Sequence, residues 1–274
     1  MPELPEVETV VRALGPQLIG RRIAAVRVSR HRLRRQWSAQ WATLLVGRKI
    51  TRVHRRGKWI ILGLMGDVHL VIHLGMTGQL TVRPAEAPVE PHTHITVSLG
   101  NREKELRFRD VRRFGSATLF RSAGQIERFF QEARLGPEPF TLESKYWRDR
   151  LAATARSLKT VLLDQRVVAG VGNIYADEAL FQARLHPARR GRSTSGAEAA
   201  RLKRALIKVL NRAIHQRGSS IRDYVDGSGR KGDYQREFLV YSRAGEPCPR
   251  CRAPIARIRL AGRSTHFCPQ CQVA

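Results

Sequence analysis

The apolar residues at the start of the chain recur at helical spacing and are followed by Gly20, a common helix stop. The periodic positions are Val7, Val10, Val11, Leu14 and Leu18. Short segments rich in β-branched residues then alternate with Gly or Pro, at 23–28, 49–53, 59–64, 68–74, 79–82, 94–99, 105–108 and 116–120. A leading helix followed by eight short strands predicts a β-sandwich or barrel.

The pattern changes at residues 136–139, where Gly-Pro-Glu-Pro ends the run of strands. Helical periods follow at 158–163, 174–183 and 198–215, and a glycine-rich polar stretch at 217–233 predicts a mobile loop. We therefore expect an α+β chain in three parts. These are an amino-terminal β-sandwich domain at 1–135, a helical domain at 136–236 and a small cysteine-bearing module at 237–274.

The 274-residue chain is strongly basic, with 50 Lys and Arg against 23 Asp and Glu and a net charge of +27. At 42% hydrophobic it is too apolar to be a disordered basic tail. Nucleic acid, an anionic membrane and polyanionic proteins are the partners that suit such a charge, and most of the basic residues are Arg, whose planar fork matches phosphates and base edges. The charge is spread along the chain without a basic amphipathic helix or a lipid signal, which favours nucleic acid.

Membrane and nucleotide signals are weak. No run of about 18 apolar residues is present, and the acidic, proline-broken start is unlike a signal peptide. We therefore expect a cytoplasmic protein that does not enter a membrane. A lone Gly-x-Gly at 170–172 lacks the third glycine and the acid of a dinucleotide fingerprint, so no nucleotide cofactor is expected.

The four cysteines form two Cys-x-x-Cys pairs near the end of the chain, Cys248 with Cys251 and Cys268 with Cys271. This spacing is typical of a site in which four thiolates hold one zinc ion. Disulfides and a redox pair are the alternatives, but an intracellular chain disfavours the first and the presence of two pairs disfavours the second. Four protein ligands predict a structural zinc, with Arg263 at the tip of a hairpin made by 255–260 and 265–267.

Residues 2–6 read Pro-Glu-Leu-Pro-Glu, with two prolines and two acids before the first helix. One interpretation is structural, because proline suits the first helical position and acids complement the helix dipole. The other is catalytic. If Met1 is removed, Pro2 presents a secondary amine whose pKa, about 7.7 to 8.0 in model peptides, falls beside positive charge. Such an amine attacks an electrophilic sugar carbon to form an iminium, while Glu3 moves protons.

Five motifs in order make the whole chain resemble the formamidopyrimidine-DNA glycosylases, bacterial enzymes that repair oxidised purines. The motifs are residues 1–9, Arg-Gly-Lys at 56–58, His-Leu-Gly-Met-Thr-Gly at 73–78, Arg-Asp-Val-Arg-Arg-Phe-Gly at 109–115 and Val-Gly-Asn-Ile-Tyr at 171–175, followed by the cysteine pairs. The resemblance implies a β-sandwich amino domain, a helix-two-turn-helix domain and a zinc finger. It also implies a monomer that holds damaged double-stranded DNA between its domains.

The resemblance assigns catalytic roles to five residues. Pro2 would be the Schiff-base nucleophile at C1′ of the damaged nucleotide, Glu3 the general acid and base, and Glu6 a second acid near the sugar. Lys58 corresponds to a lysine that moves a proton in β-elimination, and Arg263 to an arginine linked to δ-elimination and phosphate binding. Without the resemblance, Lys58 is interpreted as a solvated turn lysine and Arg263 as a surface charge.

Three further residues, Met76, Arg112 and Phe114, correspond to side chains that fill the void left by an extruded base. An enzyme that acts on a base takes it out of the stack, and inserted side chains offset part of the lost stacking. Arg112 would donate to the orphaned cytosine. A core position is the alternative interpretation for Met76 and for Phe114.

The resemblance also implies DNA contacts by His92, Arg113, Lys159 and Asn173. Asn173 in addition suits the cap of the helix that follows it. One basic position of the family falls on Thr154 or Ala155, with Arg156 as the nearest substitute.

The resemblance predicts an enzyme that removes 8-oxoguanine and formamidopyrimidines from duplex DNA and cuts the strand by β,δ-elimination. One alternative is an endonuclease VIII-type enzyme for oxidised pyrimidines, although the Leu4-Pro5 start and the three void-filling residues favour the purine enzyme. The other is a non-catalytic zinc-finger protein with a blocked Pro2 and salt-sensitive DNA binding. The loop that reads the extruded base is expected within 217–233.

Overall fold

The computed structural model describes residues 2–31, 33–35, 37–221 and 224–273. The chain divides into two compact units. The first comprises Met1–Glu132 and Gln216–Asp233, and the second comprises Ala133–His215 and Tyr234–Ala274. Met1, whose removal the catalytic interpretation requires, lies outside the described residues.

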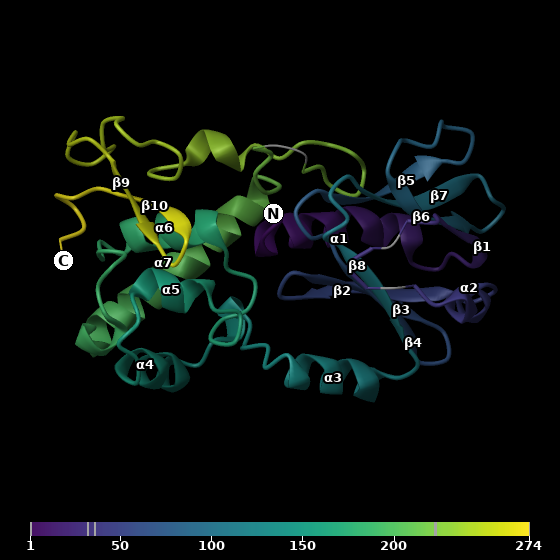
Figure 1. Cartoon of the computed structure of the whole chain (residues 1–274), viewed down its shortest axis with the longest axis horizontal. Coiled ribbons are helices and arrows are strands. Elements are labelled where there is room, and N and C mark those ends of the chain that lie inside the picture. The colour runs from purple at the N-terminus through teal and green to yellow at the C-terminus, as the bar shows by residue number, and fades with distance from the viewer. Residues whose placement is uncertain (1, 32, 36, 222–223, 274) are drawn as a thin grey trace. The chain divides into compact units, whose positions relative to one another are not determined.

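The first unit is built around a leading helix and two four-stranded antiparallel sheets (Figure 1). Their strand orders are β1-β6-β7-β5 and β2-β3-β4-β8. The prediction of a β-sandwich behind a helix is confirmed. The strands are β1 (Ile23–Val28), β2 (Ile50–Arg56), β3 (Trp59–Leu64), β4 (Val68–His73), β5 (Gly78–Pro84), β6 (Thr93–Leu99), β7 (Lys104–Asp110) and β8 (Ser116–Phe120).

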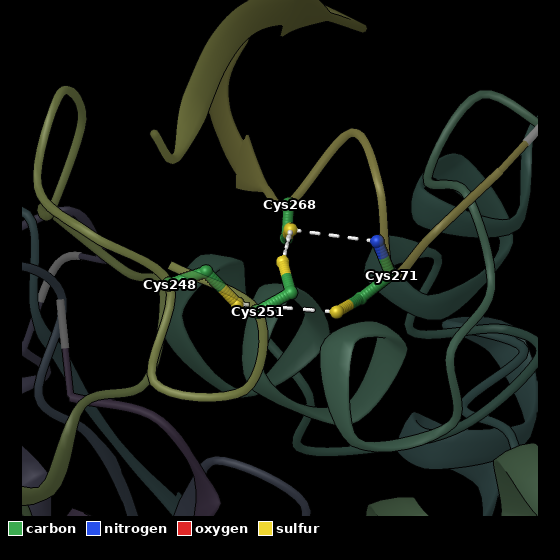
Figure 2. A group of neighbouring side chains, drawn as sticks. All are labelled: Cys248, Cys251, Cys268 and Cys271. Carbon is green, nitrogen blue, oxygen red and sulfur yellow. Dashed lines mark hydrogen bonds between the residues drawn. The ribbon is translucent and has the colours of Figure 1, made fainter. Parts of the chain in front are cut away.

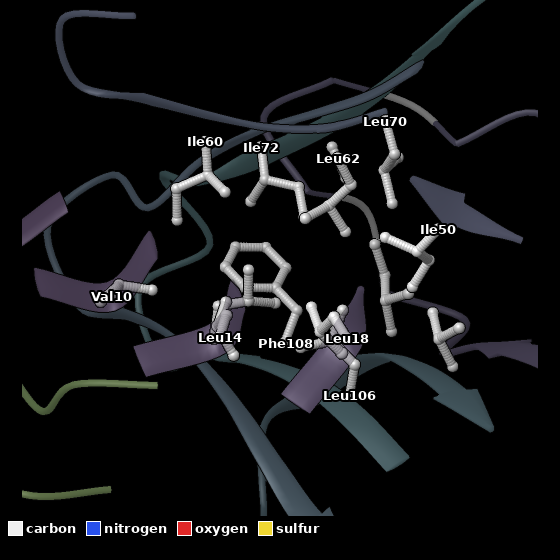
Figure 3. Close-up of a cluster of buried hydrophobic side chains, with 14 of the residues drawn as sticks. Val10, Leu14, Leu18, Ile50, Ile60, Leu62, Leu70, Ile72, Leu106 and Phe108 are labelled. Atoms are coloured by element: carbon white, nitrogen blue, oxygen red, sulfur yellow. The ribbon is translucent and has the colours of Figure 1, made fainter. Parts of the chain in front are cut away.

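The apolar face of α1 (Leu4–Leu18) completes the core of this unit. Figure 3 shows Leu14 and Leu18 of α1 beside side chains from both sheets, such as Ile60 of β3 and Phe108 of β7. Leu14, Leu18 and Ile60 are fully buried. Burial of one such side chain stabilises the fold by about 1.5–3 kcal/mol. Buried residues occur from Leu4 to Leu18, so this packing fixes the whole helix, including its first turn, against the sheets.

The sequence pattern does not predict two helices of the first unit, α2 (Ala39–Leu45) and α3 (Ala123–Glu132). The first has only 7 residues, which is too short for a clear period. On α3, the aromatic rings of Phe129 and Phe130 pack against Trp59, with centroids 5.2 and 6.2 Å away. This contact covers the outer face of the sheet that contains β3.

The glycine-rich stretch Gln216–Asp233 belongs to the first unit. Its Gly227 carbonyl accepts a hydrogen bond from the Val82 N–H of β5 at 3.0 Å, and the Tyr224 side chain joins the core. Composition predicts a mobile loop here, but the described residues of the stretch are anchored. The three-part division at 136 and 237 remains a prediction, and this stretch makes its contacts with the β-sandwich.

The second unit is helical and carries a hairpin. In α6 (Asn173–Gln182) both apolar and charged side chains are buried, whereas α7 (Gly196–His215) buries one apolar face against it. The remaining helical elements are α4 (Ser144–Ala152), α5 (Leu158–Leu163) and the 3₁₀ turns η1 (Pro139–Thr141), η2 (Gly191–Ser193) and η3 (Tyr234–Glu237).

The hairpin consists of β9 (Ala256–Leu260) and β10 (Arg263–Phe267). Ala261 and Gly262 connect them with φ of +47° and +73°, as a two-residue type I′ turn requires. Arg263 is therefore the first residue of β10, opposite Leu260, rather than a residue of the turn itself. Among the described residues, no helix has both the length and the apolar character needed to cross a membrane.

Candidate functional site

Pro2, Glu3 and Glu6 lie at the start of α1, with Pro2 directly before the N-cap, and all three residues are buried. Glu3 is the N-cap, with extended backbone. Its N–H donates to Oε2 of Glu6 at 2.8 Å, as in a capping box. The capping role that the structural interpretation gives to these acids is therefore present. The same arrangement brings the candidate nucleophile and the candidate acid to one buried helix end.

The other oxygen of Glu6 binds the loop at 216–233. Its Oε1 accepts a hydrogen bond from the Ser219 N–H at 2.8 Å. The Tyr224 hydroxyl donates to the backbone carbonyl of Glu6, at 3.2 Å. Burial and then the charge of Glu6 raise the pKa of Tyr224, which keeps this hydroxyl protonated. Glu6 thus connects the start of α1 to the loop in which the resemblance places lesion recognition.

Lys58 lies at the turn between β2 and β3, directly after Gly57, whose φ is +57°. Its side chain is only 7% exposed, so it is not a solvated turn lysine. This end of the hairpin is tied to α1, because Arg55 Nε donates to Glu8 Oε2 at 2.8 Å. The structure therefore places a buried amine on a hairpin fixed against the helix that carries Pro2.

His73, the last residue of β4, supports the turn that carries Met76. Burial lowers its pKa to about 4, and the charges of Lys58 and Arg34 add to this effect. The ring is neutral near pH 7, so Nδ1 accepts a hydrogen bond from the Gly75 N–H at 3.0 Å. This hydrogen bond fixes the main chain at the start of the turn that follows β4.

The three void-filling candidates lie on two neighbouring turns and are exposed. Met76 is 37% exposed and Phe114 is 45% exposed, so neither side chain is a core residue. The Arg112 guanidinium lies 4.6 Å from the centre of the Phe114 ring. Arg113, with φ of +57°, is exposed beside them. The structure brings this part of the predicted site together.

His92 occupies an exposed turn before β6, with φ of +66°. Its carbonyl accepts a hydrogen bond from the Asp110 N–H at 3.0 Å, directly before the turn that carries Arg112. His92 is thus exposed, and its main chain is bonded to the strand end that precedes that turn.

Lys159 departs from expectation. Its side chain is fully buried, and its amine forms an ion pair with the equally buried Asp177 and donates to the Asn173 carbonyl at 3.1 Å. A buried ammonium that is paired in this way holds α5 to the start of α6. The phosphate contact that the resemblance implies for Lys159 stays a prediction, and in this structure its amine is paired with Asp177.

Asn173 begins α6, and the N-cap is Gly172 rather than Asn173. The predicted cap is therefore wrong by one residue. The side-chain amide of Asn173 instead donates to the Ser264 carbonyl of β10 at 3.0 Å. Thr154 lies at the position where this chain lacks the basic residue of the family. Its Oγ1 accepts hydrogen bonds from Arg156, whose guanidinium also pairs with Asp164 at 2.8 Å. This pairing lowers the availability of Arg156 as a substitute phosphate ligand.

The four cysteines converge on one point (Figure 2), with ligand atoms all within 4.8 Å of one another. The Sγ atoms of Cys248 and Cys271 are 4.0 Å apart, and those of Cys251 and Cys268 are 3.4 Å apart, so all four thiols are free. Four sulfurs about 2.3 Å from a tetrahedral zinc would lie about 3.8 Å apart. The cluster therefore fits zinc and lacks the bonded sulfurs of a disulfide.

Two backbone groups support the thiolates at this centre. The Arg250 N–H points at Cys248 Sγ, and the Cys271 N–H points at Cys268 Sγ, each at 3.4 Å. Such N–H groups stabilise the charged sulfur that a zinc ligand must present. Four protein ligands leave no open position, so the centre is structural.

The hairpin with Arg263 is fixed to α6 through buried groups. Asp177 Oδ2 accepts a hydrogen bond from the His266 N–H at 3.0 Å. The adjacent Glu178 accepts the N–H groups of Leu239, Val240 and Tyr241 at 2.9–3.1 Å, while burial raises its pKa. Arg263 is exposed beyond this anchored base.

Several residues of this arrangement are not candidates in the sequence analysis. They are Asp177, Glu178, Ser219, Tyr224 and two polar residues of the quoted motifs, Thr77 and Asp110. A short polar side chain beside a glycine turn at a strand end is a usable signal for the last two. The others pair with residues far away in the sequence, and no local pattern indicates them.

Comparison with known families covers most of the chain. Residues 1–117 match the formamidopyrimidine-DNA glycosylase N-terminal domain, and residues 135–225 match the H2TH domain of the same enzymes. Residues 245–273 match the zinc finger found in FPG and IleRS. This last match and the cysteine cluster together confirm one structural zinc.

Relatives and solved structures agree over the full length. A formamidopyrimidine-DNA glycosylase of Desulforamulus reducens is 44% identical over 278 residues, with 100% of both chains covered. The Lactococcus lactis Fpg in complex with abasic-site DNA has a TM-score of 0.93 at 37% identity, covering 99% of this chain and 100% of the other. MutM in complex with carbocyclic 8-oxo-G DNA has a TM-score of 0.91 at 37% identity, with 100% of both chains covered.

Proposed function

The chain belongs to the formamidopyrimidine-DNA glycosylase family, and we propose how its own residues carry out base excision and strand cleavage. It is a DNA glycosylase of base excision repair that binds damaged double-stranded DNA. The proposed substrates are oxidised purines, namely 8-oxoguanine and formamidopyrimidines. The proposed second activity is strand cleavage at the resulting abasic site by β,δ-elimination.

Pro2 is the proposed nucleophile. Once Met1 is removed, its secondary amine attacks C1′ of the damaged nucleotide, and the glycosidic bond breaks as the base leaves with a proton. The C1′–O4′ bond then opens, O4′ takes up a proton, and an iminium joins enzyme and sugar. Glu3, at the same helix end, supplies and removes the protons of this step. Lys58 assists the proton transfer of β-elimination, and Arg263 stabilises phosphate charge during δ-elimination.

The observation that carries this proposal is the first turn of α1. A helix end that is buried by the sandwich core holds Pro2 beside Glu3, while Glu6 fixes the same turn through two backbone N–H groups. The N–H groups of this turn form the positive end of the helix dipole, which disfavours a protonated amine. The result is a rigid site for an amine nucleophile with an acid next to it.

DNA binding is proposed to use exposed groups of each unit. Met76, Arg112 and Phe114 fill the void after base extrusion, and Arg112 donates to the orphaned cytosine. His92 contacts DNA, and Arg113 binds phosphate. The zinc ion holds the hairpin that presents Arg263. We further propose that the protein acts as a monomer in the cytoplasm, associated with the nucleoid while it is on DNA.

Lesion choice and base release test the proposal together. Purified protein is incubated with duplexes that carry 8-oxoguanine opposite cytosine, a formamidopyrimidine, or an oxidised pyrimidine. We expect release of the purine lesions and strand ends that carry phosphate on both sides. Glu3→Gln should lower base release by about 10²-fold or more, as loss of a general acid does, whereas Glu127→Gln on the exposed face of α3 should not.

Preferential release of the oxidised pyrimidine would instead support the endonuclease VIII-type activity. Salt-sensitive binding without turnover, in protein whose Met1 is confirmed absent, would support the non-catalytic alternative.

A further inference from the structure

The two turns that carry the void-filling residues share one buried carboxylate, that of Asp110 at the end of β7. Asp110 is fully buried. Its Oδ1 accepts a hydrogen bond from the Thr77 hydroxyl at 2.6 Å, and its Oδ2 accepts one from the Gly115 N–H at 2.7 Å. Thr77 follows Met76 directly, and Gly115 follows Phe114 directly. One side chain therefore binds the neighbours of both exposed apolar residues.

Thr77 also binds the second turn itself. Its Oγ1, which donates to Asp110, accepts the Arg112 N–H at 3.0 Å. The Arg113 N–H reaches the Asp110 carbonyl at 3.3 Å. The hydroxyl of Thr77 thus uses both its donor and its acceptor capacity between the turns, which an apolar side chain of the same shape could not do.

Backbone packing fixes the same relationship. Gly75 has φ of +63°, and a Cβ built there would lie 2.5 Å from the Gly115 nitrogen. A Cβ on Gly115 would lie 2.9 Å from Asp110 Oδ2. The turns touch through main chain, which requires glycine at both positions and leaves little room for either turn to move alone.

We propose that Asp110 and Thr77 are positioning residues that join the two turns into one rigid reading element, so that Met76, Phe114 and Arg112 enter the duplex as a unit. The inference rests on the proposed function for the void-filling role of those three residues. The exposed side chains of Met76 and Phe114 remain free to insert, while the buried hydrogen bonds of Asp110 and Thr77 already order the main chain of the turns that carry them. Less conformational freedom is then lost on insertion, which favours the extruded state.

Thr77→Val tests the link, because it keeps the shape and removes the hydroxyl, and Thr77→Ser restores the hydroxyl. Thr51→Val is the matched control, since the Thr51 hydroxyl likewise donates a hydrogen bond, to the Gly63 carbonyl at 3.1 Å, but away from the two turns. Asp110→Asn is the second variant. A thermal unfolding curve of each protein verifies that it is folded.

Amide hydrogen exchange in the absence of DNA measures the coupling directly. We expect faster exchange of the Arg112 and Gly115 N–H groups in Thr77→Val, with protection restored in Thr77→Ser and unchanged in Thr51→Val. Unchanged protection in Thr77→Val would overturn the inference. This measurement does not depend on any catalytic activity.

Excision kinetics measure the consequence. We expect Thr77→Val to slow release of 8-oxoguanine from duplex DNA by about fivefold to tenfold, as loss of one or two hydrogen bonds would, while cleavage of a preformed abasic site changes less than twofold. In a Met76→Ala background the same substitution should cost less, because the coupled partner is already absent. Thr77→Ser should recover the parental rate.

Two further outcomes separate this inference from the function on which it rests. Loss of exchange protection without slower excision would show that the hydrogen bonds of Asp110 and Thr77 do not assist insertion into the duplex. That result would overturn the inference while the proposed function stands. Parental protein that leaves 8-oxoguanine duplex intact would overturn the proposed function, and with it the role assigned to the two turns.

Discussion

The carboxylate of Glu6 accepts the backbone N–H of Ser219 at 2.8 Å, across 213 positions of the sequence. The same carboxylate binds the N–H of Glu3, the candidate proton carrier. Glu6 therefore connects the catalytic helix end with the loop in which lesion recognition is proposed. A change in that loop is expected to reach the catalytic turn through this side chain.

Gly218→Ala should disrupt this connection. Gly218 has φ of +76°, and a Cβ there would lie 2.9 Å from Glu6 Oε1. Gly47→Ala is the matched control, because Gly47 has φ of +82° with no atom within 4 Å of the built Cβ. Both variants carry the backbone strain of about 1 kcal/mol, so the difference between them reports the contact with Glu6. We expect Gly218→Ala alone to slow 8-oxoguanine release, by about tenfold or more; equal rates in the two variants would contradict the connection.

Lys159→Met should destabilise the second unit without changing the salt dependence of DNA binding. The substitution leaves Asp177 buried without its ammonium partner, which costs about 3–5 kcal/mol of unfolding free energy. A phosphate contact would appear instead as a fall of about one in the slope of log affinity against log salt. Arg263→Ala, at an exposed position, serves as the comparison for such a fall. A lower slope for Lys159→Met at moderate salt would restore the phosphate-contact interpretation.

Stability should fall in mild acid, in part through His73. Burial and neighbouring cations lower its folded pKa to about 4 from a model value of 6.5, so the unfolded chain takes up a proton first. The stabilisation is present above pH 6.5 and is lost as the pH falls toward 4, up to about 2 kcal/mol between pH 7 and pH 5.

His73→Asn removes that titration and keeps an acceptor for the Gly75 N–H. Urea unfolding at pH 7 and pH 5 should show a smaller difference for this variant than for the parent. His215→Asn, at an exposed position on α7, should keep the parental difference. The account of His73 fails if His73→Asn retains the full pH dependence.

Removal of zinc should release the hairpin but leave the β-sandwich folded. The cysteine cluster lies in the second unit, whereas the core in Figure 3 belongs to the first. Metal analysis should find about one zinc per chain, and chelation should abolish strand cleavage until zinc is returned. Well under one zinc per chain in active protein, with all four thiols free, would be the contrary result.

The strands and the zinc ligands can be predicted from the sequence because their signals are local. Runs of β-branched residues between Gly or Pro mark each strand, and Cys-x-x-Cys spacing marks each half of the metal site. The exposure of Met76 is also indicated locally, by the glycines that flank it on a turn. These signals need no knowledge of distant partners.

The partners of buried charges cannot be predicted in the same way. Lys159 meets Asp177 from another helix, and no periodicity indicates which buried amine meets which carboxylate. The start of α6 falls one residue from its predicted position, because Gly172 serves as the N-cap, and helix ends are uncertain at this level. The loop at 217–233 has a mobile composition but gains order because Glu6 accepts the Ser219 N–H and because its own Tyr224 is buried in the core, and only the fold supplies these partners.

Trapping the covalent intermediate on Pro2 tests the central claim most directly. The purified protein is mixed with a duplex that carries one 8-oxoguanine opposite cytosine, borohydride is added, and the crosslinked peptide is mapped by mass spectrometry. The account predicts a reduced adduct on an amino-terminal Pro2 from which Met1 has been removed. An adduct on another amine such as Lys58, or salt-sensitive binding with neither adduct nor cleavage in protein that lacks Met1, would contradict it.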